Sequence, residues 1–221
     1  MAKMELSNQD TVESLDADFA KMAVEVGQHA WGITALTMRE KAFIFVAADL
    51  CARSLGFALQ THVAMARSQG VSVPTLQEAV RHLAPYVGYP TAAEALIVLA
   101  QLDDTGDDPE TPPTATPHLE LDTEVLQQIR LLDNDFGHFY HKQFVDRWGR
   151  PGLSIRERAL ATIATDVLNQ TLGDSYALHI NIALSHGAKV EQIRAVLHLV
   201  AEYGIAKTWR AFQRLNATIQ E

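Results

Sequence analysis

Residues 148–179 read WGRPGLSIRERALATIATDVLNQTLGDSYALH, and this stretch decides the fold of the chain. It opens with a Gly/Pro-rich turn and continues into residues 154–157 (SIRE), a capping-box pattern that satisfies free amide groups at the start of a helix. The helix that follows is almost wholly apolar except for Asp166, which indicates that it is buried. The chain then breaks at Leu172-Gly173 and enters a second helix that carries His179. The stretch therefore predicts a helical hairpin with a buried carboxylate and a histidine.

The same pattern occurs earlier in the chain at a constant offset. Trp31 and His62 correspond to Trp148 and His179, both 117 residues further on (148 − 31 = 117; 179 − 62 = 117). The other positions that recur at this spacing are Gly32, Leu36, Arg39, Glu40, Asp49, Leu55 and Gly56, which become Gly149, Leu153, Arg156, Glu157, Asp166, Leu172 and Gly173. A constant offset without gaps indicates a tandem duplication of one structural unit.

The sequence predicts an all-α fold built from two repeats, residues 1–102 and residues 119–221, because no segment shows strand alternation with hairpin turns. Between them, residues 103–118 (DDTGDDPETPPTATPH) are acidic, hold half of the eight prolines and show no apolar period, which is typical of an exposed linker. Each repeat should begin with one long helix, which ends at about Gly27 in the first repeat and runs through Phe144 in the second.

Composition limits the possible partners. The 221 residues carry 18 Lys and Arg against 27 Asp and Glu, a formal net charge of −9, which leaves no basic stripe for a nucleic acid. No run of about twenty apolar residues could cross a membrane, and the opening MAKMELSNQD lacks the apolar core of a signal peptide. The single cysteine, Cys51, has apolar neighbours and should be buried and unreactive. We therefore expect a cytoplasmic protein with no nucleic-acid or membrane partner.

An aspartate and a histidine are placed to meet in each repeat. Asp49 lies six residues before the turn at Leu55, and His62 lies seven residues after it. At 1.5 Å per residue both are about 10 Å from the turn, level on facing helices, and the same relation holds for Asp166 and His179. A carboxylate on one imidazole nitrogen fixes the tautomer and leaves the other nitrogen free for proton transfer. The alternative interpretation is that each pair only satisfies a buried aspartate.

Arginines at the start of these hairpins are candidate ligands for a substrate carboxylate. Arg39 and Arg156 stand in the first turn of a predicted helix, where a cation opposes the helix dipole. Each should therefore face a carboxylate, either of the protein or of a ligand, and Arg158 lies close by in the sequence. Glu40 and Glu157 are best explained as the glutamates of the two capping boxes.

Further histidines have weaker claims. His82 and His198 each stand six residues before a glycine, with Tyr86 near the first, and they could line a substrate pocket or simply be core residues. His138 and His141 have an i, i+3 spacing that a metal site could use, but the first repeat has neither histidine and no third ligand stands out. We therefore expect no metal and no other cofactor.

Several short motifs together carry a family resemblance. They are Trp148 to Leu153, Arg158, Thr162 to Ala164, His179 with Gly187, and His198 before Gly204 in the second repeat, and Trp31-Gly32, Leu36, His62 with Gly70, and His82 to Pro90 in the first. Both repeats thereby resemble the carboxymuconolactone decarboxylase family, whose relatives include alkylhydroperoxidase D. The resemblance implies an all-α fold and rings of three or six subunits, hence a homo-oligomer of three chains when two repeats are fused. For the decarboxylase branch it implies cofactor-free loss of CO2 from an unsaturated lactone acid.

The chain departs from the family pattern at two places. The peroxidase branch has a Cys-x-x-Cys shortly before its histidine, and the corresponding residues here are Leu55 and Ala58 in one repeat and Leu172 and Ser175 in the other. Without thiols there is no peroxidatic chemistry. A glutamate often found after the Arg-Glu-Arg-type run is also replaced by alanine in both repeats, Ala42 and Ala159.

These features favour an enzyme, a cofactor-free lyase (decarboxylase) or isomerase that acts on a small carboxylated, enolisable or lactone substrate. An arginine would hold the carboxylate, and an aspartate-oriented histidine would transfer the proton. The substrate-binding candidates are Arg156, Arg158, Arg39, His198, His82, Trp148 and Tyr86. The alternative is a non-catalytic ligand-binding or assembly member of the same fold.

The sequence leaves open which repeat is active. We favour His179 with Asp166 as the proton-transfer pair, because the preceding Arg-Pro-Gly-Leu run resembles the decarboxylase form most closely. The competing choice is His62 with Asp49, because the first repeat keeps the complete His82-to-Pro90 ending.

Overall fold

The computed structural model of the chain describes residues 6–102 and 119–219. The linker predicted at residues 103–118 lies outside the described residues. Within them every regular element is a helix, so the predicted all-α fold is confirmed. None of these helices is long and apolar enough to cross a membrane.

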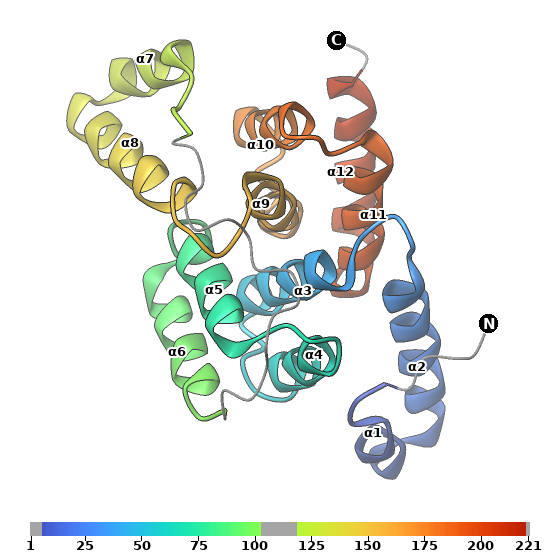
Figure 1. The fold of residues 1–221 in the computed structure, drawn as a ribbon. Coiled ribbons are helices and arrows are strands. Elements are labelled where there is room, and N and C mark those ends of the chain that lie inside the picture. The colour runs from blue at the N-terminus through green and yellow to red at the C-terminus, as the bar shows by residue number, and fades with distance from the viewer. Residues whose placement is uncertain (1–5, 103–118, 220–221) are drawn as a thin grey trace.

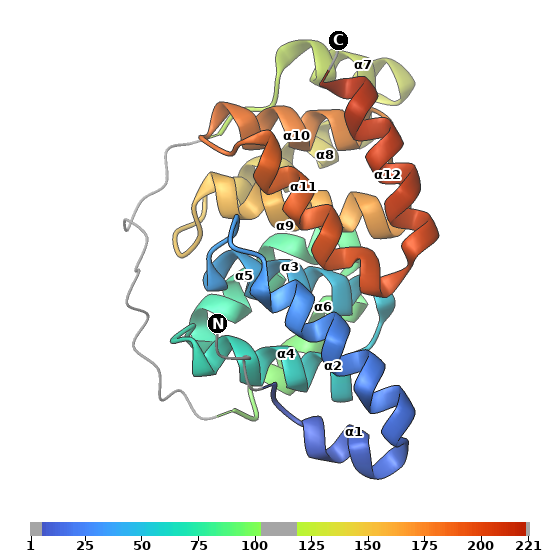
Figure 2. The same ribbon diagram turned by 90° about the vertical axis from the view of Figure 1, so that its right-hand side faces the viewer.

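The helices of the two repeats follow in the same order, with one helix of the first repeat, residues 73–87, matched by two consecutive helices of the second, residues 190–203 (Figures 1 and 2). The first repeat contains α1 (Gln9–Leu15), α2 (Ala17–Gly32), α3 (Met38–Ala52), α4 (Phe57–Ser68), α5 (Val73–Val87) and α6 (Tyr89–Leu99). The second contains α7 (Thr123–Leu132), α8 (Asn134–Trp148), α9 (Ile155–Asn169), α10 (Asp174–Ser185), α11 (Val190–Val200), the short 3-10 helix η1 (Ala201–Tyr203) and α12 (Ile205–Thr218).

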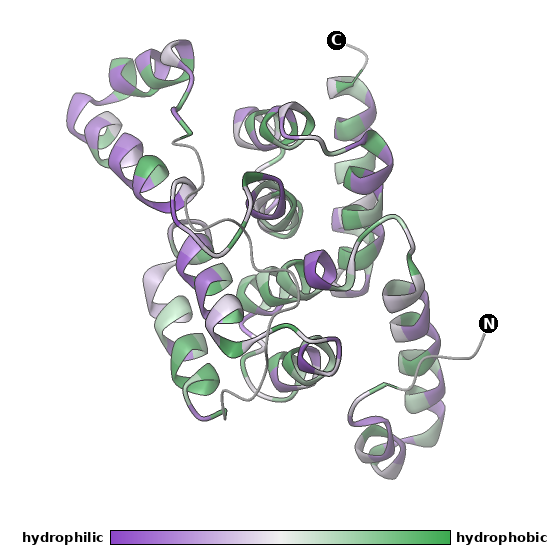
Figure 3. Ribbon diagram, in the orientation of Figure 1, coloured by the Kyte–Doolittle hydropathy of each residue, from purple (hydrophilic) through white to green (hydrophobic). Residues whose placement is uncertain are grey.

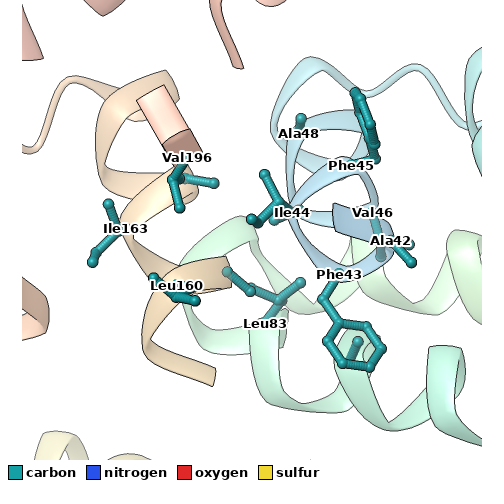
Figure 4. Close-up of a cluster of buried hydrophobic side chains, with 14 of the residues drawn as sticks. Ala42, Phe43, Ile44, Phe45, Val46, Ala48, Leu83, Leu160, Ile163 and Val196 are labelled. Atoms are coloured by element: carbon teal, nitrogen blue, oxygen red, sulfur yellow. The ribbon is translucent and has the colours of Figure 1, made fainter. Parts of the chain in front are cut away.

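Helices α3 and α9 form the centre of the molecule. Every residue of α3 from Arg39 to Leu50 is buried, and Figure 3 shows α3 as almost continuously hydrophobic beyond its first turn. Figure 4 shows Ile44 of α3 beside Leu160 and Ile163 of α9, with side chains of α5 and α11 around them. Burying one such side chain contributes about 1.5–3 kcal/mol, so this contact is the main apolar core of the fold.

The predicted capping boxes start both central helices. The Thr37 hydroxyl accepts a hydrogen bond from the Glu40 amide, and the Glu40 carboxylate accepts one from the Thr37 amide. Ser154 and Glu157 make the same exchange at the start of α9. The chain therefore enters the core at equivalent points in the two repeats.

The two capping glutamates also join the repeats, since each pairs with an arginine of the other repeat. Arg39 Nε lies 2.6 Å from Glu157 Oε1, and Arg156 lies 2.6 Å from Glu40 Oε1. Arg39 additionally donates a hydrogen bond to the Gly152 carbonyl. The carboxylates that these arginines were predicted to face therefore belong to the protein.

The leading helices of each repeat pack on the other repeat. Helix α2 contacts α11, and α8 contacts α5. As Figure 1 shows, the α1–α2 and α7–α8 hairpins lie at opposite corners of the molecule. This exchange places residues of both repeats around each of the Asp–His pairs.

The prediction of one long leading helix in each repeat is wrong. The chain breaks at Asp16, between α1 and α2, and at Asp133, between α7 and α8. Each aspartate has an extended backbone and its carboxylate accepts a hydrogen bond from the amide three residues on, Phe19 or Phe136, at 2.7 Å. The break therefore results from a helix N-cap placed inside an amphipathic pattern.

The two exchanged ion pairs should differ in their contribution to stability. The Arg39 side chain is 6% exposed, whereas the Arg156 side chain is 30% exposed. We expect Arg39→Met to lower the free energy of unfolding by about 3 kcal/mol, because both members of its ion pair are shielded from solvent, with the Glu157 side chain only 12% exposed. Arg156→Met, where solvent screens the charge, should cost about 1 kcal/mol. Urea denaturation of the two variants measures the difference, and equal losses would contradict this account.

Candidate active site

Each Asp–His pair is positioned by a tight reversal between two helices. In the first repeat α3 ends at Arg53, which has a left-handed backbone (φ 55°), and the Ser54 amide donates to the Asp49 carbonyl. Gln170 has the same backbone (φ 59°) at the end of α9. These reversals bring α4 back along α3, and α10 back along α9, so that each histidine faces its aspartate.

The pairs predicted from the spacing are present in both repeats. His62 Nδ1 lies 2.8 Å from Asp49 Oδ2, and His179 Nδ1 lies 2.6 Å from Asp166 Oδ2. A carboxylate can only accept, so each imidazole carries its proton on Nδ1, and Nε2 is the nitrogen left for other chemistry.

The surroundings of His62 are completed by η1 of the second repeat. The Tyr203 hydroxyl donates to Asp49 Oδ1 at 2.7 Å, so both oxygens of this buried carboxylate are used. Glu202 Oε1 lies 3.8 Å from His62 Nε2. Residue 202 as a whole is exposed, but its side chain is only 19% exposed. An acid therefore stands beside the free nitrogen of His62.

Two aromatic rings hold the His62 imidazole in place. The Phe45 ring stacks on His62 with ring centroids 4.4 Å apart and planes 11° apart. Trp31 stacks on the other side of Phe45 at 4.9 Å. The imidazole is thus fixed both by Asp49 and by a stacked face.

A cavity of about 520 Å³ opens beside this imidazole. His62, Glu202 and Tyr203 line one side of it, and helix α2 lines another through small residues that include Ala20, Ala23 and Gly27. The His62 side chain is 14% exposed, which makes it accessible from the cavity. We call this arrangement the His62 site.

Burial changes the protonation of the two residues from η1. It raises the pKa of the Glu202 carboxyl to about 7, against the opposing charge of His62 and with an added rise from Asp49. Burial, followed by the negative charge of Asp49, also raises the pKa of Tyr203, so this phenol stays protonated. Near neutral pH Glu202 can therefore both give and accept a proton.

The His179 pair has a different environment. Asp166 Oδ1 accepts hydrogen bonds from Thr171 and Ser175, at 2.6 and 2.8 Å. His179 is fully buried, and its Nε2 has no hydrogen-bond partner among the described residues.

Aromatic side chains seal this second pair. The Trp148 ring lies over His179 with centroids 5.8 Å apart and planes 16° apart, and Phe144 stacks on Trp148 at 5.3 Å. Trp148 Nε1 donates to the Tyr86 hydroxyl, and the Tyr86 ring meets the His179 ring edge-on. The burial of His179 Nε2 beneath these rings argues against our preference for His179 as the proton-transfer residue.

Differences between equivalent positions explain why one pair is open and the other sealed. Gly27, at the cavity wall, corresponds to Phe144, and Ala23 corresponds to Tyr140, each 117 residues on. Tyr140 is close enough to Asp166 for that charge to add to the effect of burial in raising the tyrosine pKa. Large rings therefore occupy in the second repeat the space that small residues leave open in the first.

His82 belongs to the sealed pair and not to the open one. The Thr162 hydroxyl donates to the Arg158 carbonyl, so its oxygen accepts the hydrogen bond from His82 Nε2 at 2.9 Å. His82 is fully buried. Burial, followed by the positive charge of Arg158, holds its pKa well below the usual value of 6.5. His82 is therefore neutral and is placed within the core.

The arginines predicted to bind substrate are held by the protein. Arg39 and Arg156 make the exchanged ion pairs described above. Arg158 is fully buried and contacts the Glu78 carboxylate at 3.2 Å and the Arg150 carbonyl at 2.7 Å. None of the three lines the cavity of the His62 site.

His198, another substrate-binding candidate, does not line the cavity of the His62 site. The residue that corresponds to His82 is Leu199, at the offset of 117, and His198 lies one residue earlier. One residue turns a helix position by about 100°. His198 accordingly lies on the exposed side of α11, where it meets His29 and Phe212.

Other candidate chemistry is not assembled in the parts of the chain that the structure describes. Over those residues no group of three or more His, Cys, Asp or Glu is arranged to hold a metal, and His138 and His141 are not part of such a group. Burial raises the pKa of the Cys51 thiol to about 12, so it is not a nucleophile at neutral pH.

Sequence reasoning missed Glu202, Phe45 and the small residues of α2. The signal for these residues lay in the positions at which the two repeats have different residues at the offset of 117, and not in the positions at which they have the same residue. Glu202 corresponds to Pro85, and Phe45 corresponds to Thr162. Comparing unlike residues at the common spacing would have marked the positions at which the two sites diverge.

Comparison with known proteins places the chain in a family. The model of the carboxymuconolactone decarboxylase family matches residues 17–101 and 136–217, one segment in each repeat. A solved structure from Burkholderia xenovorans LB400, described as a "putative gamma-carboxymuconolactone decarboxylase subunit", has a TM-score of 0.56 and 22% sequence identity. The similarity covers 98% of this chain and 92% of that one, and at this identity it shows the fold alone. No match was found among curated proteins.

His82 should make the fold sensitive to acid. Above pH 6.5 its imidazole is neutral in both the folded and the unfolded chain. Below pH 6.5 the unfolded chain binds a proton that the folded chain does not, because the folded pKa is lowered. The free energy of unfolding should therefore decrease as the pH is lowered below 6.5, by at most about 1.4 kcal/mol per pH unit from this residue.

His82→Leu copies Leu199 of the other repeat and should remove this part of the pH dependence. Thr162 keeps its bond to the Arg158 carbonyl in that variant. Urea denaturation between pH 7.5 and 5 compares the two slopes. Identical slopes for the variant and the unchanged protein would show that His82 is not the acid-sensitive group.

Proposed function

Because the chain belongs to the carboxymuconolactone decarboxylase family, we propose that it is a lyase- or isomerase-type enzyme that transfers a proton at the His62 site. The substrate is a small enolisable or lactone compound, and the reaction uses no cofactor. His62 is the acid–base group, and the sealed pair of His179 and Asp166 is structural.

One observation carries the proposal. His62 has its Nδ1 bound to Asp49 and lines a cavity of about 520 Å³ together with Glu202, whereas His179 is fully buried beneath aromatic rings. A base must come within hydrogen-bond reach of the proton it removes, and only the first imidazole meets that requirement.

The residues around the cavity have separate roles in an enolisation. Asp49 holds the Nδ1 proton, so Nε2 presents its lone pair to a carbon-bound hydrogen of the substrate. The imidazolium that forms is stabilised by the Asp49 carboxylate at 2.8 Å. Glu202, protonated in part near pH 7, can donate to the oxygen on which negative charge develops.

Peroxidase chemistry does not fit this chain. The positions of the peroxidase thiols are Leu55 and Ala58 beside His62, and Leu172 and Ser175 beside His179. The single thiol, Cys51, has a pKa of about 12. A disulfide cycle has no second sulfur to close on.

The test compares His62→Gln with His179→Gln. Two enolisable probes, phenylacetone and phenylpyruvate, report deuterium uptake at the benzylic carbon in D2O by NMR. We expect the protein to accelerate uptake in at least one probe, and His62→Gln to lower that acceleration by a hundredfold or more. His179→Gln should keep the activity of the folded protein while lowering its melting temperature. The reverse pattern, or full activity in both folded variants, would refute the assignment.

We also propose that the chain assembles as a homo-oligomer, most simply of three chains. Large apolar side chains are exposed at equivalent positions of both hairpins: Leu15, Phe19 and Met22 on the first, and Leu132, Phe136 and Phe139 on the second. Phe19 and Met22 also line the cavity of the His62 site, so a neighbouring chain at this hairpin would lie beside that cavity. Repeated apolar faces of this kind mark a contact between copies. Figure 1 shows these hairpins at opposite corners, where each is free to meet a neighbour.

Light scattering after gel filtration tests the assembly. The expected mass is three times the chain mass of 24.4 kDa. The double variant Leu132→Glu/Phe136→Glu, which changes the hairpin away from His62, should shift the protein to smaller species. A monomer at micromolar concentration in the unchanged protein would count against the proposal.

A further inference from the structure

The charge of the cavity limits what can bind at the His62 site. Of the described residues that line it, the charged ones are Glu202 and, when protonated, His62, and neither lysine nor arginine is present. Most of the wall is hydrocarbon, provided by side chains such as Trp31, Phe57 and Met65. The cavity is therefore apolar with one acidic spot.

Cations near the cavity are turned away from it. Lys41 contacts Trp31, which lines the cavity. Its Nζ donates to the Trp31 main-chain carbonyl, and the Lys41 side chain is buried. Arg39 and Arg156 are engaged with the glutamates between the repeats. No described guanidinium or ammonium group is thus placed to pair with an anion at His62.

Carboxylates, in contrast, already lie beside both nitrogens of the His62 ring. Asp49 lies behind His62 at 2.8 Å, and Glu202 lies 3.8 Å from Nε2 on the cavity side. A substrate carboxylate here would lose its hydration and meet like charges without a partner. Such a ligand is disfavoured on both counts.

From this we infer that the substrate of the His62 site is an uncharged, largely hydrocarbon molecule with a carbonyl or lactone oxygen that reaches His62 and Glu202. This inference rests on the proposed proton-transfer function and narrows it. The carboxylated substrates of the initial hypothesis are set aside, and so is decarboxylation of a free carboxylate, since no lysine or arginine is among the described residues that line the cavity.

The resulting step is an isomerisation that balances within the site. His62 Nε2 takes the proton from the carbon next to the carbonyl, and the electron pair of that C–H bond forms the C=C bond of an enol. The carbonyl π pair moves to oxygen, which takes the proton of the Glu202 carboxyl. When the substrate has a C=C bond on the other side of that carbon, the intermediate is a dienol. Return of the His62 proton to the far carbon of the dienol, and of the enol proton to Glu202, shifts the C=C bond next to the carbonyl and restores both residues.

The size of the cavity, as well as its charge, suits an uncharged hydrocarbon ligand. In the first repeat Ala23 and Gly27 leave open the space that Tyr140 and Phe144 fill in the second. The Phe57 ring is 51% exposed at the cavity, where it can cover a hydrocarbon ligand. A volume of about 520 Å³ is within the range of small-molecule sites.

The experiment is a calorimetric titration at pH 8, where most of Glu202 is ionised. The probes share one aromatic body: phenylacetone is neutral, phenylpyruvate carries a carboxylate, and phenethylamine carries an ammonium group. We expect phenylacetone to bind at least tenfold more tightly than phenylpyruvate. It should also bind more tightly than phenethylamine, whose ammonium group must give up its hydration beside a mostly hydrocarbon wall. Tighter or equal binding of either charged probe would overturn the inference, and so would a lack of phenylacetone binding at millimolar concentration.

Two variants locate the effect. Glu202→Gln removes the acidic spot and should bring the affinities of phenylacetone and phenylpyruvate at least fivefold closer. Gly27→Phe copies Phe144 and should abolish phenylacetone binding; the new side chain must displace the end of Leu6, which lies 2.8 Å from the position of a Cβ there. Glu25→Phe adds the same ring to an exposed position of α2 outside the cavity wall and serves as the control. Unchanged binding in Gly27→Phe would overturn the inference.

Failure of this inference and failure of the proposed function give different results. If deuterium uptake depends on His62 but phenylpyruvate is the better ligand and substrate, the proton-transfer function stands and the neutral substrate class is wrong. If phenylacetone binds in the cavity but uptake does not depend on His62, the preference for a neutral ligand stands and the catalytic role of His62 is wrong.

Discussion

The packing of α3 against α9 is the contact on which the rest of the structure depends. It buries most of the residues of both helices, and each helix contributes a capping glutamate that pairs with an arginine of the other repeat. This contact brings the end of each repeat over the Asp–His pair of the other. Tyr203 and Glu202 complete the surroundings of His62, and Tyr86 covers His179. Neither pair therefore has its full environment within one repeat.

Duplication allowed the Asp49–His62 and Asp166–His179 pairs to take different roles. Both keep the same aspartate and histidine, because a buried carboxylate needs a partner whether or not the site is used. They differ in what covers the imidazole. Beside His62, Gly27 leaves space, and at the equivalent place Phe144 packs on Trp148 above His179. The sealed site contributes rigid core and the open one contributes a cavity, so a retained motif by itself does not identify the reactive copy.

How far the site could be predicted depended on the range of the interactions. The Asp49–His62 distance follows from helix geometry over thirteen residues, and the spacing was sufficient to predict it. The preference for His179 relied on a loop that resembles the family pattern, whereas the accessibility of the imidazole is set by rings from α8 and α5. The single long leading helix failed for a local reason, since Asp16 caps a new helix where the apolar pattern continues.

The sequence by itself determined the helical hairpins, the duplication, the capping boxes and the meeting of aspartate with histidine, because all of these depend on residues close together in the chain or on a repeated spacing. Only the tertiary structure decided which histidine is accessible, where the arginines go and which acid stands beside the free nitrogen. Those outcomes depend on contacts between residues far apart in the chain, such as Glu202 with His62 and Arg39 with Glu157. Free space in a core is the volume that packed side chains leave unfilled, so it exists only once both repeats are folded together.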